Sequence, residues 1–136
     1  MKFILKIEPK PQARARARRG GVYEDPRMKV WRRRCRMLVE RAWRGRVQLI
    51  GALEADVKFY IKPPKYVSQV KKNQVRLLSE TIPVGKKPDI DNYEKALYDS
   101  MSGIVFKDDG QIARHCVCKL YSVKPRIEVE IKEIGD

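Results

Sequence analysis

Hydrophobic and polar positions along the chain recur with the periods of strands and helices. Residues 2–7 and 55–62 alternate in the manner of half-buried strands, and prolines follow both. From Pro26 onward, apolar side chains return every three or four positions, which predicts a helix that stops near Gly45. Its apolar stripe consists of Met28, Trp31, Cys35, Leu38 and Ala42.

The second half of the chain shows the same helical and strand periods. Residues 66–78 predict a short basic helix, and residues 89–102 predict another. Segments 104–106, 111–122 and 126–134 supply the final strands. In the basic helix, the side chains expected to face inward are Val67, Val70, Gln74, Leu77 and Leu78. The order β-α-β-α-α-β-β predicts one domain, 1–136, of the α/β (α+β) class, with a mixed sheet and helices packed against it.

Composition supports a globular protein. The 136 residues are 43% hydrophobic and 35% charged, enough to bury a core. No apolar run approaches the roughly 20 residues of a membrane span. The apolar start is short and interrupted by charge, unlike a signal peptide. We therefore expect a cytoplasmic protein without a membrane partner.

The three cysteines do not form a disulfide framework or a zinc site. On a strand, Cys116 and Cys118 share one face while His115 points to the other, and a second pair of ligands is missing from the sequence. We interpret Cys116 and Cys118 as half-buried strand thiols. His115 is interpreted as structural, although its place near the acidic residues described below leaves a functional role open.

Positive charge is concentrated near the N-terminus. Residues 1–46 hold 16 Lys/Arg against 4 Asp/Glu, whereas the remainder holds 15 against 13, for a net charge of +14. A solvated basic face is the simple interpretation, but self-repulsion and the phosphate-binding geometry of guanidinium favour nucleic acid as the partner, ahead of an anionic membrane. The arginines lie in a loop-like segment and in the predicted helix: Arg14, Arg16, Arg18 and Arg19, then Arg32, Arg33, Arg34 and Arg36.

Acid gathers in the segment "KPDIDNYEKALYD", residues 87–99. The apolar side of this predicted helix is Ile90, Tyr93, Leu97 and Met101, while Asp91, Lys95 and Asp99 follow one another at i, i+4 and i+8 on a different face. Each acid has an ordinary interpretation: Asp89 as an N-cap, Asp91 as a surface partner of Lys95, and "DDGQ" at 108–111 as a hairpin turn.

Taken together, these residues indicate a catalytic site. Asp89 and Asp91 lie within one turn, and a sheet beside the helix can bring Asp109 to them. Three hard oxygen donors suit Mg²⁺ or Mn²⁺, and such an ion explains carboxylates in a protein that binds phosphate. With the Lys95 ammonium nearby, the pattern predicts a metal-dependent phosphodiesterase acting on nucleic acid.

The stretch "KPDIDNYEKALYDSMSGIVFKDDGQI", residues 87–112, resembles the signature of the RusA-type Holliday junction resolvases. The resemblance implies that Asp89, Asp91 and Asp109 bind metal and that Lys95 is essential. Asn92 and Asp108 match accompanying positions, with Asp108 and Asp109 both candidates for the ion. Asp99 matches a further acid that supports Lys95 or contacts metal.

The resemblance also implies a RusA-like fold and a homodimer that resolves four-way junction DNA. Paired, Mg²⁺-dependent nicks in opposed strands would leave ligatable duplexes. One alternative is another metal-dependent nuclease that prefers flaps, forks or single strands. A second is a non-catalytic nucleic-acid-binding protein. A third, a small basic ribosome-associated protein, leaves the acids unexplained.

Overall fold

The computed structural model describes residues 1–13, 16–18, 21–23 and 25–135. Its main sheet has the strand order β1-β6-β4-β5. Strand β4 pairs parallel with β5 and antiparallel with β6, and β6 pairs antiparallel with β1. The mixed sheet predicted from the sequence is therefore confirmed. Its strands are β1 (Lys2–Leu5), β4 (Leu53–Ile61), β5 (Ile112–Tyr121) and β6 (Arg126–Glu133).

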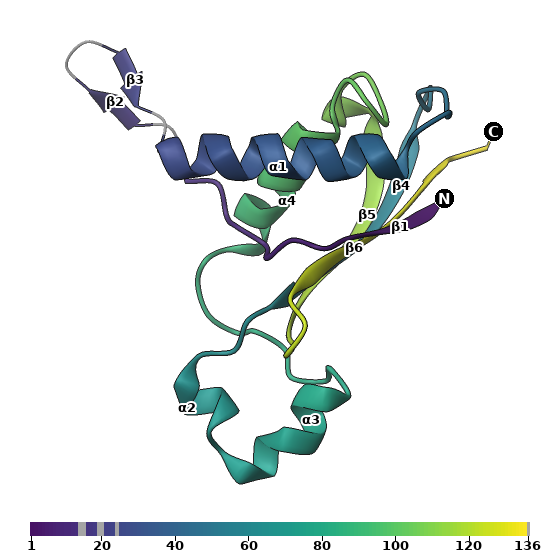
Figure 1. Cartoon of the computed structure of the whole chain (residues 1–136). Coiled ribbons are helices and arrows are strands. Elements are labelled where there is room, and N and C mark those ends of the chain that lie inside the picture. The colour runs from purple at the N-terminus through teal and green to yellow at the C-terminus, as the bar shows by residue number, and fades with distance from the viewer. Residues whose placement is uncertain (14–15, 19–20, 24, 136) are drawn as a thin grey trace.

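Two helices, α1 (Pro26–Ala42) and α4 (Ile90–Met101), lie on one face of this sheet (Figure 1). Helix α1 begins where expected, because Pro26 occupies its first turn and the Asp25 carboxylate accepts the Arg27 amide. The helix buries Met28, Trp31 and Cys35 of the predicted stripe. Further along, Val39 is buried in place of Leu38 and Ala42, which are only partly buried. The core is formed by these side chains, the buried face of α4, and the inward positions of the strands.

Helix α1 also holds the helix layer together. Arg36 donates from Nη1 to the carbonyl oxygens of Asp99 (3.4 Å) and Ser102 (2.9 Å) at the C-terminal end of α4. A guanidinium is favourable there because the helix dipole is negative at that end. One arginine of the predicted basic cluster in α1 thus has a structural role.

A second, smaller unit replaces the predicted helix over 66–78, which is wrong as a continuous element. The chain forms α2 (Lys65–Ser68), the 3₁₀ turn η1 (Lys71–Asn73) and α3 (Gln74–Leu78). The Asn73 and Gln74 side-chain amides donate to the carbonyls of Val67 and Ser68, which an uninterrupted helix would need for its own backbone. Of the positions expected inward, Val67 and Leu77 are buried, Val70 is partly buried, and Gln74 and Leu78 are exposed.

The basic segment near the N-terminus includes a hairpin where a loop was expected. Strands β2 (Arg16–Arg18) and β3 (Gly21–Tyr23) pair antiparallel, with Arg16 opposite Tyr23. Alternating Arg and Ala residues carry the period of a strand, which explains the difference. The hairpin projects beyond the N-terminal end of α1 (Figure 1).

The expected strand at 104–106 is also wrong. Gly103, with φ +85°, turns the chain after α4, and Ile104 and Val105 both donate their amides to the Met101 carbonyl. Phe106 is buried and makes only isolated bridges, to Leu49 and Ser102, within the described residues. The apolar run therefore fills the core as a loop.

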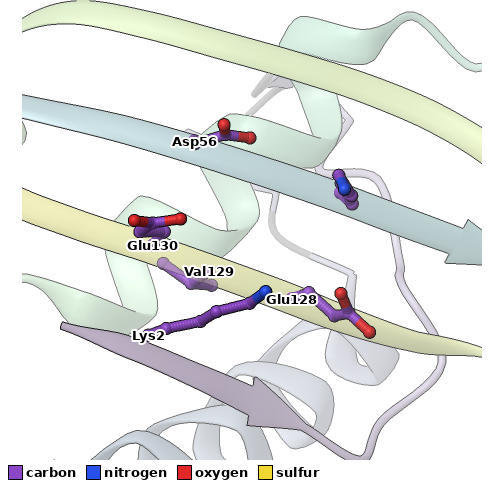
Figure 2. A pocket seen from close by; sticks show the side chains of 6 residues that line it. Lys2, Asp56, Glu128, Val129 and Glu130 are labelled. Atoms are coloured by element: carbon purple, nitrogen blue, oxygen red, sulfur yellow. The ribbon is translucent and has the colours of Figure 1, made fainter.

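The other face of the sheet is left uncovered and carries charge of both signs. A hollow of about 30 Å³ lies there, and Figure 2 shows Asp56, Glu128, Glu130 and Lys2 around it with the helices behind the strands. Lys58 completes the charged lining. No helix within the described ranges is both long and apolar enough to cross a bilayer.

Candidate active site

Helix α4 begins at the acidic signature. Asp89 takes the N-cap position in extended conformation, and its carbonyl accepts the Asn92 amide at 3.1 Å. Among the described residues, no amide donates a capping hydrogen bond to the Asp89 carboxylate. Asp91 follows in the first turn and is exposed. Both residues lie at the N-terminal end of α4, where the positive end of the helix dipole attracts negative charge.

The Lys95 ammonium lies between two carboxylates. Its Nζ is 2.9 Å from Asp99 Oδ1, one turn further along α4, and 3.4 Å from Asp109 Oδ2 in the turn η2 (Asp109–Gln111). The pKa of Lys95 is raised, first by the hydrogen bond to Asp99 and then by the charges of Asp99 and Asp109. Lys95 thus pairs with Asp99 and Asp109 in place of the expected surface partner Asp91. The contact with Asp109 joins helix α4 to the turn that follows it in the signature.

The segment "DDGQ" forms a capped 3₁₀ turn, so the hairpin interpretation is wrong. Asp108 Oδ1 accepts the Gly110 amide at 3.2 Å, while Gln111 Oε1 accepts the amides of Lys107 and Asp108. The Gly110 hydrogen bond lowers the pKa of Asp108. The Asp108 carboxylate is used in shaping the turn, and Asp109 contacts Lys95.

A buried acid beside this cluster was missed by sequence reasoning. Glu94, only 8% exposed, accepts a hydrogen bond from Tyr98 Oη at 3.0 Å and lies 2.6 Å from His115 Nδ1. Burial, and then the Glu94 charge, raise the pKa of Tyr98. The i, i+4 spacing of Glu94 and Tyr98, next to the apolar side of the helix, was the available signal.

Strand β5 supplies His115 to the helix side of the sheet, as its alternation predicted. Cys116 and Cys118 lie opposite Asp56 and Lys58 in the register, on the uncovered face, where Cys116 is exposed and Cys118 is partly buried. His115 lines a hollow of about 300 Å³ together with Glu94, Tyr98, Asp109 and residues 112–114. The hollow therefore reaches Asp109, the acid that contacts Lys95.

Two basic parts of the chain meet at the start of α4. The Gln12 amide donates to the Asn92 carbonyl at 3.0 Å, and Trp31 Nε1 donates to the Glu8 carbonyl at 2.8 Å, so the segment ahead of the arginines lies against both helices. Lys119 Nζ donates to the carbonyls of Lys86 and Pro88, each at 2.8 Å, directly before Asp89.

The predicted DNA-binding arginines are placed only in part. Arg14 and Arg19 lie outside the described residues. Arg16 and Arg18 belong to β2, whose backbone is described.

Comparison with known families now identifies the chain. The family model for endodeoxyribonuclease RusA matches residues 6–132, nearly the whole length. The chain belongs to the RusA family. It is accordingly an endodeoxyribonuclease, a hydrolase that acts on DNA, in a family of Holliday junction resolvases. The uncharacterized protein YqaN of Bacillus subtilis (strain 168) is 35% identical over 138 residues, covering 99% of this chain and 97% of the relative.

RusA-family resolvases depend on a divalent metal. Among the described residues, no three His, Cys, Asp or Glu side chains form a ready-made group for an ion. The Lys95 ammonium between Asp99 and Asp109 shows, however, that the carboxylates on this side of α4 attract a cation. Carboxylate oxygens are the donors that Mg²⁺ and Mn²⁺ prefer, so the donor set fits the metal class of the family.

Proposed function

We propose that this RusA-family enzyme is a divalent-metal-dependent Holliday junction resolvase that nicks two opposed strands as a homodimer. The observation that carries the proposal is the contact of Lys95 with both Asp99 and Asp109, which unites the helix and the Asp-Asp turn of the signature. A protein that only bound DNA would gain nothing from acids gathered beside its basic segments.

Asp89, Asp91 and Asp109 would hold the ion, with Mg²⁺ expected and Mn²⁺ an acceptable substitute. When bound, the metal supplies Lewis-acid chemistry and lowers the pKa of a water. Lys95 then stabilises negative charge as it develops on the phosphate. Asp99, the nearer partner of Lys95, keeps the ammonium oriented when Asp109 is engaged elsewhere.

The accompanying residues have positioning roles in this proposal. Asp108 fixes the turn that presents Asp109, through its bond with the Gly110 amide. Asn92 receives the Gln12 amide on its carbonyl, which keeps the N-terminal segment beside the site. Arg14, Arg16, Arg18 and Arg19, which follow that segment in sequence, would bind DNA phosphates near the scissile strand.

A homodimer suits the symmetry of the substrate. A four-way junction presents pairs of equivalent strands, and a two-fold dimer places one site on each of two opposed strands. The sequence resemblance and the family match support this assembly. Light scattering on the purified protein should give twice the 15.9 kDa chain mass.

The test is cleavage of a strand-labelled four-way junction, compared with a Y-fork and a linear duplex of the same sequence. Symmetric nicks in opposed strands, dependent on Mg²⁺ or Mn²⁺ and scarce on linear duplex, support the proposal. Equal cleavage of the fork would indicate a general branched-DNA nuclease. Junction binding with no product in either metal would indicate a DNA-binding protein.

A further inference from the structure

Residues 62–88, which we call the basic arm, carry a net positive charge. The total over residues 47–136 does not show this charge, because acids elsewhere in that range offset it. The arm has seven Lys/Arg and one Asp/Glu, a net of +6, whereas the rest of residues 47–136 has 8 against 12, a net of −4. All seven basic side chains are exposed: Lys62, Lys65, Lys71, Lys72, Arg76, Lys86 and Lys87.

The single acid of the arm, Glu80, is hydrogen-bonded by two residues outside the arm. Glu80 accepts hydrogen bonds from Arg126 Nη1 at 2.6 Å and Nη2 at 2.9 Å, and from Ser122 Oγ at 2.5 Å. Arg126 also lies 3.9 Å from the centroid of the Tyr60 ring. These contacts fasten the arm to the end of the sheet and leave its exposed surface strongly cationic.

The basic arm is a folded unit, so its charges are held in place. Val67, Leu77 and Tyr121 form a small core of their own, supported by partly buried apolar neighbours. The Val84 amide donates to the Lys119 carbonyl, and the Tyr121 amide donates to the Ile82 carbonyl. Both hydrogen bonds join the arm to the outer edge of β5, the last strand in the order of the sheet.

The position of the arm relates it to the proposed cleavage site. It ends directly before Asp89, where Lys119 holds the backbone of residues 86 and 88. Figure 1 shows α2 and α3 at one end of the sheet and the β2–β3 hairpin beyond the other side of α4, with α4 between them. A duplex whose strand reaches Asp89 and Asp91 therefore has the basic arm on one side and the arginine-containing strand β2 on the other.

We propose that the basic arm is a second DNA-binding surface, which holds the phosphate backbone of a duplex arm on the side of the site opposite the N-terminal arginines. The inference rests on the proposed function, cleavage of branched DNA. Six of the seven cations are lysines, whose flexible point charges suit sequence-independent phosphate contacts. The charge of the arm points to a DNA duplex as its partner. The test below must distinguish a duplex from a second copy of the chain.

The experiment replaces three of these cations, in Lys71→Gln/Lys72→Gln/Arg76→Gln, and measures affinity for a four-way junction over a range of salt without divalent metal. Each lost phosphate contact should make the negative slope of log K against log salt shallower by about 0.9, giving a total of up to about 2.7. A matched control, Lys2→Gln/Lys58→Gln/Lys132→Gln, removes the same charge from exposed positions on the uncovered sheet face. Its slope should stay near that of the wild type.

The outcomes separate the inference from the function beneath it. Wild-type binding with an unchanged slope in the arm variant, or an equal loss in the control, would overturn the second surface and leave the nuclease proposal intact. A dimer that dissociates in the arm variant would also overturn it, in favour of a protein interface. Failure of the wild type to bind or cut junctions would instead refute the proposed function. Lys86→Gln/Lys87→Gln provides an independent variant should the triple variant melt early.

Discussion

At the scale of single residues, the proposed catalytic role of Lys95 can be weighed against a purely structural one. Its two ion pairs are exposed, with 55% of the Lys95 side chain accessible, so they contribute little to folding. A cation positioned beside a reacting phosphate contributes far more to the rate. The two roles therefore differ in magnitude.

We predict that Lys95→Ala lowers single-turnover nicking by on the order of a hundredfold or more, because the transition state loses a positioned cation. Stability should fall by only about 0.3–0.5 kcal/mol, and junction affinity should stay near that of the wild type. The measurements are single-turnover nicking, thermal melting and junction binding. Lys58→Ala, on the uncovered face, is the control for loss of one positive charge; nicking by Lys95→Ala at the control rate would remove the catalytic role.

Some residues of the candidate site can be predicted from their spacing in the sequence, and others cannot, because their partners are distant along the chain. Asp91, Lys95 and Asp99 share a helical face, which spacing reveals. Glu94 is hidden among apolar positions, and its partner His115 comes from a strand distant in sequence. Only the fold shows that the two meet.

At the scale of elements, the ion pair of Glu80 with Arg126 is one of the contacts that fasten the basic arm to the sheet. Hydrogen bonding from Arg126, and then from Ser122, holds the pKa of Glu80 below its usual 4.5. A carboxyl whose pKa is depressed in the folded state adds stability above its unfolded pKa, and this stability is lost as pH falls through the folded value.

We therefore predict that wild type exceeds Glu80→Gln in stability at pH 7, and that the difference shrinks as pH falls below 4.5. Urea unfolding of both proteins at several pH values measures it. Glu133→Gln, which alters an exposed acid at the far end of β6, controls for general acid effects. A difference between wild type and Glu80→Gln that stays constant with pH would show that the Arg126 contact does not stabilise the arm.

Elements with a sustained period were predictable, and short ones were not. The stripe of α1 and the alternation of β4 carry their structure in the local pattern. The break in 66–78 comes from the Asn73 and Gln74 amides competing for backbone carbonyls, which a count of apolar positions does not detect. The run at 104–106 is apolar because it is buried, and a loop can satisfy that requirement as well as a strand.

At the scale of the whole molecule, the surfaces differ in the sign of their charge. The uncovered sheet face mixes acids and bases, whereas the N-terminal region and the basic arm are cationic. Summing charge over residues 47–136 hid the arm, because its surplus is offset by the acids of the site and the sheet. A count over residues 62–88 alone separates these contributions, and the fold shows that these residues form one unit.

We predict that Arg14→Gln/Arg16→Gln/Arg18→Gln weakens junction binding and flattens its salt dependence, because fewer counterions are released. Junction affinity measured at several salt concentrations reports both effects. The triple lysine variant of the uncovered face, described above, serves again as the charge-matched control. A salt slope equal to that of the wild type would exclude these arginines from the interface.

We propose that the acids Asp89, Asp91 and Asp109 enable the protein to cut branched DNA. Asp91→Asn tests it most directly, because the substitution removes a proposed metal ligand from an exposed position and preserves the size of the side chain. The measurement is single-turnover nicking of a strand-labelled four-way junction in Mg²⁺, with affinity for the same junction measured in parallel. We predict that nicking is abolished while junction affinity is unchanged or improved, because the substitution removes negative charge near the phosphate. Nicking at the wild-type rate, or loss of binding by a folded variant, would contradict it.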